Sequence, residues 1–482
     1  MRDFRSVLYL IGILLCIEAV AMIIPMITDL IYGNSDWQVF LLSSLLSFFI
    51  GLVMYLSFKR EKTKIKVREA FFLTIISWIV IALFAALPFV YSTANLNYSD
   101  AIFESVSGIT TTGATTIYNL NELSEGILIW RSLLQWFGGI GIIVLALAIL
   151  PTLQIGGMQL LHMEHDDPYE KTLPKINQFV FEIFSIYILL TFLCSIMYFV
   201  AGMSGFNAIT HAMTTISTGG FSTQNDSLAG FNSATIEFIS VFFMIVGSLP
   251  FVIYLKMTHG DFKSLFKDDQ IKLFIFILTF LIIITAYWLY IHIDNNIFNC
   301  FRIAAFNITS IMTGTGYTSS NYSAWGSFGI VIMLFIMFIG GCAGSTTGGI
   351  KIFRLQLLFR GSITQIKKLT HPHGVFLTSF NNKSVGEDAY NSIMGFFFMY
   401  IFIFILSAIV LSFFNLDFLT ALSASASAIS NVGPGIGSVI GPEGNYVSIT
   451  APAKWVLLIT MLIGRLELFT FLILLSGSFW RK

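Results

Sequence analysis

The stretch SDAIFESVSGITTTGATT at residues 99–116 decides the fold, because the chain repeats its pattern three more times. The other copies are FNAITHAMTTISTGGFST at 206–223, CFRIAAFNITSIMTGTGYTSS at 300–320 and DFLTALSASASAISNVGPGIG at 417–437. Each copy starts with an apolar run too short to cross a membrane and leads into a turn rich in glycine or small polar residues. Aligning the turns places Gly113, Gly220, Gly316 and Gly433 in register. Self-similarity at a regular spacing predicts a fourfold internal repeat.

The composition is that of an integral membrane protein. Of the 482 residues, 56% are hydrophobic and only 11% are charged, whereas soluble domains are about one quarter charged. The 26 Lys and Arg balance the 26 Asp and Glu, so there is no basic surplus to support nucleic-acid binding. The four cysteines show neither disulfide nor zinc spacing.

Ten apolar stretches are long enough to cross a bilayer, which takes about 20 residues per helix. They cover 6–30, 38–57, 70–92, 127–150, 178–202, 234–256, 271–292, 327–350, 391–413 and 454–477. An even number of spans predicts that both termini lie on one side of the membrane.

Lys and Arg are distributed unevenly among the connecting segments. The segments that hold 22 of the 26 are 1–5, 57–69, 151–177, 256–272, 351–388 and 481–482. The positive-inside rule makes these segments, and both termini, cytoplasmic. The segments on the opposite side hold eleven acidic residues and only two basic ones, Arg302 and Lys454; these segments are 29–36, 93–125, 203–237, 293–326 and 414–454. This acidic surplus either attracts cations to the outer surface or is only the charge bias that topology produces.

The repeated turns predict a pore if they surround one axis. Non-helical backbone is tolerated inside a membrane only where protein or water covers it. Four extended segments would direct backbone carbonyls at a shared path and replace the hydration shell of a monovalent cation. Glycine would allow the close approach and a positive φ. The alternative is a set of Gly/Ser/Thr packing motifs between membrane helices.

At these residues the chain resembles the Trk/Ktr/HKT superfamily of potassium transporters, specifically its TrkH type. The resemblance spans essentially the whole chain, including the N-terminal helix pair at about 6–57. The stretches that carry it are TTTGAT at 110–115, QWFGGIGI at 135–142, STGGFS at 217–222, GCAGSTTGGIK at 341–351, NVGPG at 431–435 and GRLE at 464–467.

The resemblance implies an all-α polytopic membrane protein with four pseudo-symmetric membrane helix–pore helix–membrane helix repeats around one pore, plus the N-terminal pair. The expected units are 1–66, 67–160, 161–258, 259–368 with an intramembrane loop at 340–349, and 369–482. It also implies a multi-pass homodimer in the lipid bilayer of the plasma membrane, the inner membrane of a bacterium. A cytosolic TrkA-type nucleotide-binding regulatory protein is the expected partner.

The resemblance further implies potassium uptake driven by membrane potential, with potassium as the substrate and no cofactor in this chain. Potassium would be the only metal bound, at the backbone carbonyls of a selectivity filter. The filter residues are Thr111, Thr112, Gly113, Thr218, Gly219, Gly220, Gly314, Thr315, Gly316, Asn431, Val432 and Gly433. Gly113 stands where sodium-selective plant relatives have serine, which indicates a potassium-permeable filter. A symporter coupled to protons or sodium is the alternative, and its proton carriers would come from Glu18, Glu182 and Glu467.

Residues 340–349 predict a break inside the eighth span. They contain five glycines, and each disfavours a helix by about 1 kcal/mol relative to alanine. The third repeat alone carries this insertion, so it would form a flap under the filter, and the resemblance implies a gate. The gate residues are Gly341, Gly344, Ser345, Thr346, Thr347, Gly348, Gly349 and Arg465. A tight helix crossing is the alternative.

Arg465 lies near the middle of the last span, too deep to snorkel easily. We expect its guanidinium to face the pore or the flap carbonyls, and the alternative is an ion pair with Glu182 or Glu467.

Three other features have simpler interpretations. Gly138, Gly139 and Gly141 indicate close helix packing, because no strand precedes them as a dinucleotide site requires. His211 is expected to be a packed, hydrogen-bonded side chain. The His, Glu and Asp cluster at 162–167 could bind a metal, but a solvated loop or regulator-docking face explains it better. A membrane-embedded enzyme would need a nucleophile–base or metal motif at a span, and none is present, so we predict a transporter and no enzyme.

Overall fold

The computed structural model describes residues 4–59, 67–146, 176–371, 373–381 and 383–480. Its α-helices are α1 Arg5–Ala21, α2 Ile23–Tyr32, α3 Trp37–Phe58, α4 Val67–Ala85, α5 Leu87–Tyr91, α6 Tyr98–Ile109, α7 Glu125–Val144, α9 Ile176–Val200, α10 Gly205–Ile216, α11 Ala234–Ser248, α12 Phe251–Thr258, α13 Lys263–Lys267, α14 Asp269–His292, α15 Ile297–Met312, α16 Gly326–Ile336, α17 Ile352–Thr370, α18 Glu387–Phe413, α19 Phe418–Ser430, α20 Ala451–Arg465, α21 Leu468–Leu475 and α22 Gly477–Trp480. Short 3-10 turns are η1 Leu120–Glu122, η6 Ser227–Phe231 and η7 Tyr322–Ala324. Strands β1 Ser379–Phe380 and β2 Lys383–Ser384 pair antiparallel.

The same order of elements occurs four times after the N-terminal helices. A long helix, a shorter helix, a turn and a further helix or helix pair follow one another as α4–α6–α7, α9–α10–α11/α12, α14–α15–α16 and α18–α19–α20/α21, and in the third repeat the last of these, α16, has only 11 residues. Each short helix begins at a polar N-cap whose side chain accepts a backbone N–H of the first turn, and these caps are Asn97, Ser204, Asn296 and Asp417. The predicted all-α repeat fold is confirmed, while the boundaries of the units stay predictions.

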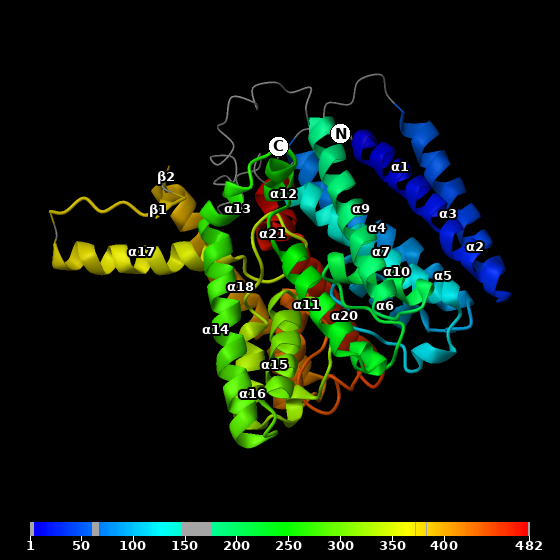
Figure 1. Cartoon of the computed structure of the whole chain (residues 1–482). Coiled ribbons are helices and arrows are strands. Elements are labelled where there is room, and N and C mark those ends of the chain that lie inside the picture. The colour runs from blue at the N-terminus through cyan, green and yellow to red at the C-terminus, as the bar shows by residue number, and fades with distance from the viewer. Residues whose placement is uncertain (1–3, 60–66, 147–175, 372, 382, 481–482) are drawn as a thin grey trace.

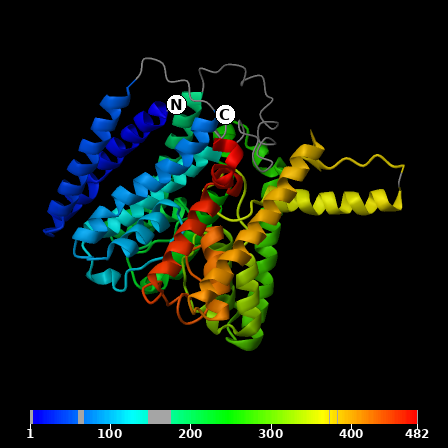
Figure 2. The ribbon, with the colours of Figure 1, turned by 180° about the vertical axis from the view of Figure 1, so that it is seen from behind.

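Both termini lie at the same end of the helix bundle (Figures 1 and 2). This agrees with the even number of crossings that the sequence predicts. In both views α17 projects sideways from that end of the bundle.

The described residues contain seven helices long and apolar enough to cross a membrane, or nine if two bent pairs are each one span. The bent pairs are α11 with α12, at 90°, and α20 with α21, at 115°. Two of the ten predicted spans, at 234–256 and 454–477, are therefore bent helix pairs and not single continuous helices. The eighth predicted span, at 327–350, is broken as its glycine run predicts, because only its first part forms a helix, the 11-residue α16.

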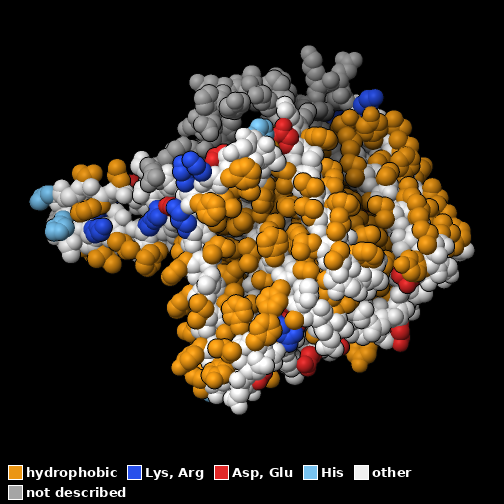
Figure 3. All heavy atoms as spheres, viewed as in Figure 1, with side chains coloured by type: hydrophobic (Ala, Val, Ile, Leu, Met, Phe, Trp, Pro, Cys, Tyr) orange, Lys and Arg blue, Asp and Glu red, His pale blue; other side chains and the backbone are white. Residues whose placement is uncertain are grey.

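The outside of the bundle is apolar. Large hydrophobic side chains on separate long helices are exposed, such as Phe49 on α3, Phe192 on α9, Phe276 on α14 and Phe398 on α18. Figure 3 shows hydrophobic side chains covering the middle of one face, with charged side chains mainly toward its upper and lower edges. The chain is a multi-pass membrane protein whose exposed apolar surface faces lipid.

The N-terminal helices are fastened to the first repeat by two buried carboxylates. Asp29 accepts the Gly126 N–H at 2.7 Å, near the start of α7. Asp36 accepts the Ser124 hydroxyl at 2.9 Å and also the Thr93 N–H and hydroxyl. Because Ser124 is itself the N-cap of α7, these contacts fix the position of a helix that reaches the centre of the molecule.

Candidate ion-conducting site

The four turns have the same backbone conformation at equivalent positions. Two residues in each turn have positive φ, and these pairs are Thr111 and Gly113, Thr218 and Gly220, Gly314 and Gly316, and Asn431 and Gly433. The residue between each pair donates its N–H back to the short helix, and these bonds are Thr112 to Ser107, Gly219 to Thr214, Thr315 to Ser310 and Val432 to Ser427, at 2.9–3.0 Å. The backbone therefore repeats in the register that the glycine alignment predicts.

The four turns meet in a closed ring. A Cβ atom added to any of the four register glycines would collide with a carbonyl oxygen of the next repeat along the chain, and the fourth would collide with the first. The distances are 2.3 Å from Gly113 to the Gly219 oxygen, 1.7 Å from Gly220 to the Thr315 oxygen, 2.0 Å from Gly316 to the Val432 oxygen, and 2.5 Å from Gly433 to the Thr112 oxygen. Glycine is thus required by contact as well as by φ. We call the oxygens of Thr112, Gly219, Thr315 and Val432 the carbonyl ring.

In three of the four repeats, a serine hydroxyl of the short helix donates a hydrogen bond to a carbonyl of the turn that follows. Ser107 donates to the Ala114 carbonyl at 2.6 Å and Ser310 to the Tyr317 carbonyl at 2.6 Å. In the fourth repeat Ser427 donates to the Gly433 carbonyl at 2.8 Å. The second repeat has Thr214 at this position, and its hydroxyl is hydrogen-bonded to the Tyr317 hydroxyl.

The glycine-rich segment after α16 forms a buried loop whose two ends pair with each other. Gly340 donates its N–H to the Ile350 carbonyl at 2.9 Å, and Ile350 donates to Phe338 at 3.0 Å. Ser345, Thr346 and Thr347 are at most 1% exposed. The predicted break in the span is present, and we call residues 340–349 the intramembrane loop.

This loop contacts the C-terminal ends of two short helices. The Thr346 hydroxyl lies 3.1 Å from the carbonyl oxygen of Ile216, the last residue of α10, and 3.1 Å from the Thr218 hydroxyl. Gly348 packs so closely on α19 that a Cβ there would lie 2.1 Å from the Ser430 oxygen. The loop therefore lies directly beside the turns that form the carbonyl ring.

Arg465 contacts the loop through its guanidinium. It donates to the Thr346 carbonyl at 2.9 Å and, more weakly, to the Gly138 carbonyl at 3.4 Å. Arg465 is the last residue of α20, so it lies at the break between α20 and α21. Of the two acids that the alternative named as partners of Arg465, Glu467 pairs with Arg354 at 2.7 Å and Glu182 accepts a hydrogen bond from Gln178 at 3.0 Å.

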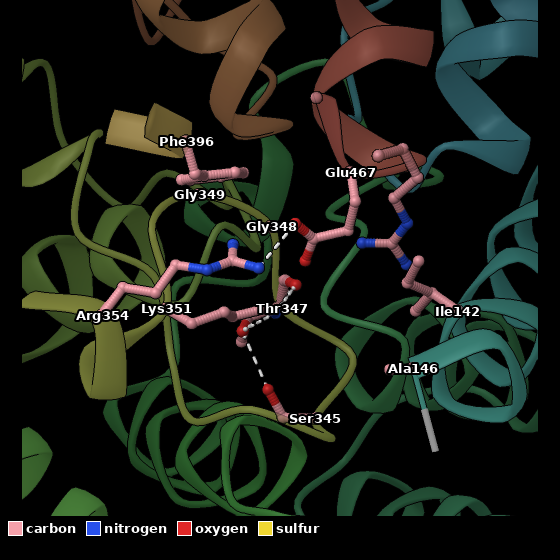
Figure 4. A pocket seen from close by; sticks show the side chains of 12 residues that line it. Ile142, Ala146, Ser345, Thr347, Gly348, Gly349, Lys351, Arg354, Phe396 and Glu467 are labelled. Carbon is pink, nitrogen blue, oxygen red and sulfur yellow. Dashed lines mark hydrogen bonds and ion pairs between the residues drawn. The ribbon is translucent and has the colours of Figure 1, made fainter. Parts of the chain in front are cut away.

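A pocket lies between the loop and α20/α21. Its lining residues are Ile142, Ala146, Ser345, Thr347, Gly348, Gly349, Lys351, Arg354, Phe396, Gly464, Arg465 and Glu467. Figure 4 shows Arg354 and Glu467 directed toward each other. Lys351 is hydrogen-bonded to the Thr347 carbonyl and hydroxyl. Three cationic side chains and one carboxylate line this pocket, so its wall is electropositive.

Comparison with known proteins identifies the family of this chain. A sequence model of the TrkH family, described as a cation transport protein, matches residues 36–482. This chain belongs to the TrkH family. The predicted resemblance is confirmed, and so is the prediction of a transporter and no enzyme.

Curated and solved TrkH-family proteins match this chain over its full length. The Trk system potassium uptake protein TrkI of Halomonas elongata is 37% identical and covers 100% of this chain and 98% of its own. TrkH of Escherichia coli K12, also named a Trk system potassium uptake protein, is 37% identical over 99% of this chain and 100% of its own. The crystal structure of the potassium transporter TrkH from Vibrio parahaemolyticus has a TM-score of 0.93 and 36% identity, with full coverage of both chains.

In this TrkH-family chain the predicted site residues form two groups that touch. The twelve turn residues include the four whose oxygens form the carbonyl ring, and the loop residues with Arg465 lie beside these turns. Asn431 joins the first and fourth repeats, because its side-chain amide donates to the Thr112 hydroxyl at 3.0 Å.

Two residues of α7 that were not predicted as site residues, Arg131 and Gln135, contact the second turn or the segment that follows it. Arg131 is 1% exposed and pairs with Glu104 of α6 at 2.8 Å, while donating to the Ser222 carbonyl beyond the second turn. Gln135 donates to the Gly219 carbonyl at 2.6 Å. An arginine inside a span was an available signal for the first, whereas nothing in the sequence relates Gln135 to a residue 84 positions away.

The predicted acidic outer surface is reduced by pairing and burial. Asp100 pairs with Lys454 at 2.7 Å and Glu237 with Arg302 at 3.3 Å. Glu104 is fully buried against Arg131, and Asp29 and Asp36 cap and anchor the start of α7. The eleven acids counted outside are therefore not eleven free carboxylates, and the cation-attracting field is weaker than their number indicates.

Two of the simpler interpretations fit the structure. His211 is buried, with its ring nitrogens 2.8 Å from the Asn207 carbonyl oxygen and 3.0 Å from the Ser222 hydroxyl. A Cβ on Gly138 would lie 1.9 Å from the Ile109 oxygen, which is close packing. The cluster at 162–167 lies outside the described residues, and among those described no three His, Cys, Asp or Glu side chains form a metal site.

Proposed function

We propose that this chain takes up potassium through a single pore lined by the four turns. The observation that carries the proposal is the closed carbonyl ring, in which each repeat contributes one oxygen and each register glycine makes room for its neighbour's oxygen. Rings of carbonyl oxygens substitute for the hydration shell of potassium. The relatives named as potassium uptake proteins support the choice of cation.

The filter residues are those of the four turns, and the ring carbonyls are the ion ligands. The short helices end at these turns, so their C-terminal partial charges also favour a cation. The uptake is driven by the membrane potential. The symporter alternative is less well supported, because Glu467 is bound in an ion pair with Arg354 and Glu18 lies in α1, outside the repeats.

The intramembrane loop is the gate of this pore. Its Thr346 carbonyl is held by Arg465, its Thr347 carbonyl by Lys351, and its Thr346 hydroxyl by the end of α10. Three cationic side chains in the pocket beneath add an electrostatic barrier to cations. Opening therefore requires movement of the loop away from the turns.

The chain forms a homodimer in the plasma membrane, the inner membrane of a bacterium, with both termini and the basic segments in the cytoplasm. Support for the dimer comes from α17, which projects from the bundle (Figure 1) with Phe359, Ile363 and Ile366 exposed at helical spacing. A cytosolic nucleotide-binding regulator acts on the loop from this side. Cysteine crosslinking at Ile366 between two copies tests the dimer.

The experiment that tests the function is cation flux into liposomes containing the purified protein, measured without and with the regulator. We expect rubidium, a potassium substitute, to enter faster than sodium. Gly113→Ser adds a side chain within 2.3 Å of the Gly219 oxygen and should abolish the preference for potassium and rubidium. No rubidium flux with the regulator present would contradict the proposal, and an unchanged preference in Gly113→Ser would show that the first turn is out of register.

A further inference from the structure

We propose that Gln135 is a selectivity-determining positioning residue, which sets the orientation and ligand strength of one carbonyl in the ring. The inference rests on the proposed function. It assigns a part in the selectivity of that pore to a side chain outside the four turns. Gln135 lies on α7 and is fully buried.

The side-chain amide of Gln135 forms hydrogen bonds with the second turn at the residues before and after Gly220. Its Nε2 donates to the Gly219 carbonyl at 2.6 Å, and its Oε1 accepts the Phe221 N–H at 3.0 Å. Because the Phe221 N–H requires an oxygen partner, the amide nitrogen must face the Gly219 oxygen. Gln135 thus acts on the residues that flank a register glycine.

The second repeat differs from the others in a way that matches these hydrogen bonds. The residue before the register glycine is Thr112, Thr315 or Val432 in the other repeats but Gly219 here. A Cβ on Gly219 would lie 2.4 Å from Cδ of Gln135, so glycine at this position leaves the room that the amide occupies. The second repeat also has Thr214 where the others have a serine that holds the turn, and Gln135 supplies a substitute.

The hydrogen bond makes the ring unequal. Among the described residues, the Gly219 oxygen is the one oxygen of the carbonyl ring that accepts a hydrogen bond from a side chain. A carbonyl already bound to a donor is a weaker and less mobile cation ligand, and ligand field strength influences discrimination between potassium and sodium. Removing the donor should therefore raise the field strength of the Gly219 oxygen and also let this oxygen move more freely. Both changes favour the smaller sodium ion.

The test is the ratio of rubidium to sodium uptake in liposomes for Gln135→Met and Gly219→Ala. The first removes both hydrogen bonds at similar volume, and the second pushes the amide away from the opposite side. Gln178→Met, at an exposed glutamine, and Gly205→Ala, with no atom within 4 Å of the added Cβ, are the matched controls. We expect both test variants to lower the ratio by about fivefold, the effect of one hydrogen bond, and both controls to keep it.

The ratio separates selectivity from a merely structural role. Reduced total flux at an unchanged ratio would overturn the inference, and so would loss of folded protein in both test variants while both controls purify normally. If only one variant purifies, its ratio decides. Absent rubidium flux in the wild type would instead overturn the proposed function.

Discussion

Each register glycine meets two separate demands, one from its own backbone and one from the neighbouring repeat. Gly220 has φ of 76° and lies where a Cβ would be 1.7 Å from the Thr315 oxygen. Gly202 has φ of 105° but no atom within 4 Å of an added Cβ. The two positions therefore separate backbone strain from displacement of a ring carbonyl.

Gly220→Ala should reduce rubidium uptake by about tenfold or more, equivalent to ~1.4 kcal/mol in a rate, because the Thr315 carbonyl must move. Gly202→Ala carries only the backbone strain and should keep its uptake within about twofold. The measurement is initial rubidium uptake into liposomes, normalised to folded protein. Equal losses in both variants would mean that strain, and not the carbonyl ring, explains the glycine.

The ion pair of Arg131 and Glu104 is buried on both sides, with the two side chains 2% and 0% exposed. Breaking such a pair from one side typically costs about 3–5 kcal/mol, whereas replacing both partners is far milder. Arg131→Met should therefore lower the melting temperature markedly, and adding Glu104→Gln should restore part of the loss. Thermal unfolding of the purified single and double variants measures this. A double variant as unstable as the sum of the singles would rule out the coupling.

Sequence reasoning at the residue scale reached the register glycines but not their supports. Gly113, Gly220, Gly316 and Gly433 are recognisable because four copies can be compared within one chain. Gln135 contacts the second repeat, as does Arg131 through the Ser222 carbonyl, and a single sequence does not show which residues of two repeats are in contact. Their roles became visible only when α7 was located against the second turn.

Two breaks in the membrane helices differ in how far the sequence reveals them. The break after α16 follows from five glycines in ten residues. The break between α20 and α21 has no glycine at its corner, where Glu467 has φ of 61°. Glu467 at that corner pairs with Arg354 of α17, a tertiary contact that the sequence does not show, and the expectation of a continuous last span was wrong.

Shortening the intramembrane loop within 341–349 should raise basal rubidium flux, because fewer residues remain to cover the turns. Thr346→Val should raise it to a smaller extent, since the valine loses the hydroxyl contacts with Ile216 and Thr218. Thr370→Val, at an exposed threonine on α17, is the control. Basal flux is measured without the regulator and regulated flux with it. A shortened loop with unchanged basal and regulated flux would remove the gating role.

On the scale of the whole molecule, four repeats produce one ring because each short helix ends at a turn that fits against the next. The composition predicts the hydrophobic outside of the bundle (Figure 3). The distribution of Lys and Arg predicts which connecting segments lie together at one end of it. The outer surface is less acidic than the sequence predicts, because Asp100, Glu104 and Glu237 find basic partners in the folded chain. The number of charges in each segment predicts which side of the membrane that segment faces. The same number overstates the negative field at the predicted outer surface.

The most direct test of the carbonyl ring as the cation site is anomalous X-ray diffraction from crystals grown in rubidium. We predict a rubidium peak between the carbonyl oxygens of Thr112, Gly219, Thr315 and Val432, and we expect Gly220→Ala to lose it. The absence of a peak at the ring, with rubidium bound instead in the pocket beside Arg354 and Glu467, would contradict it.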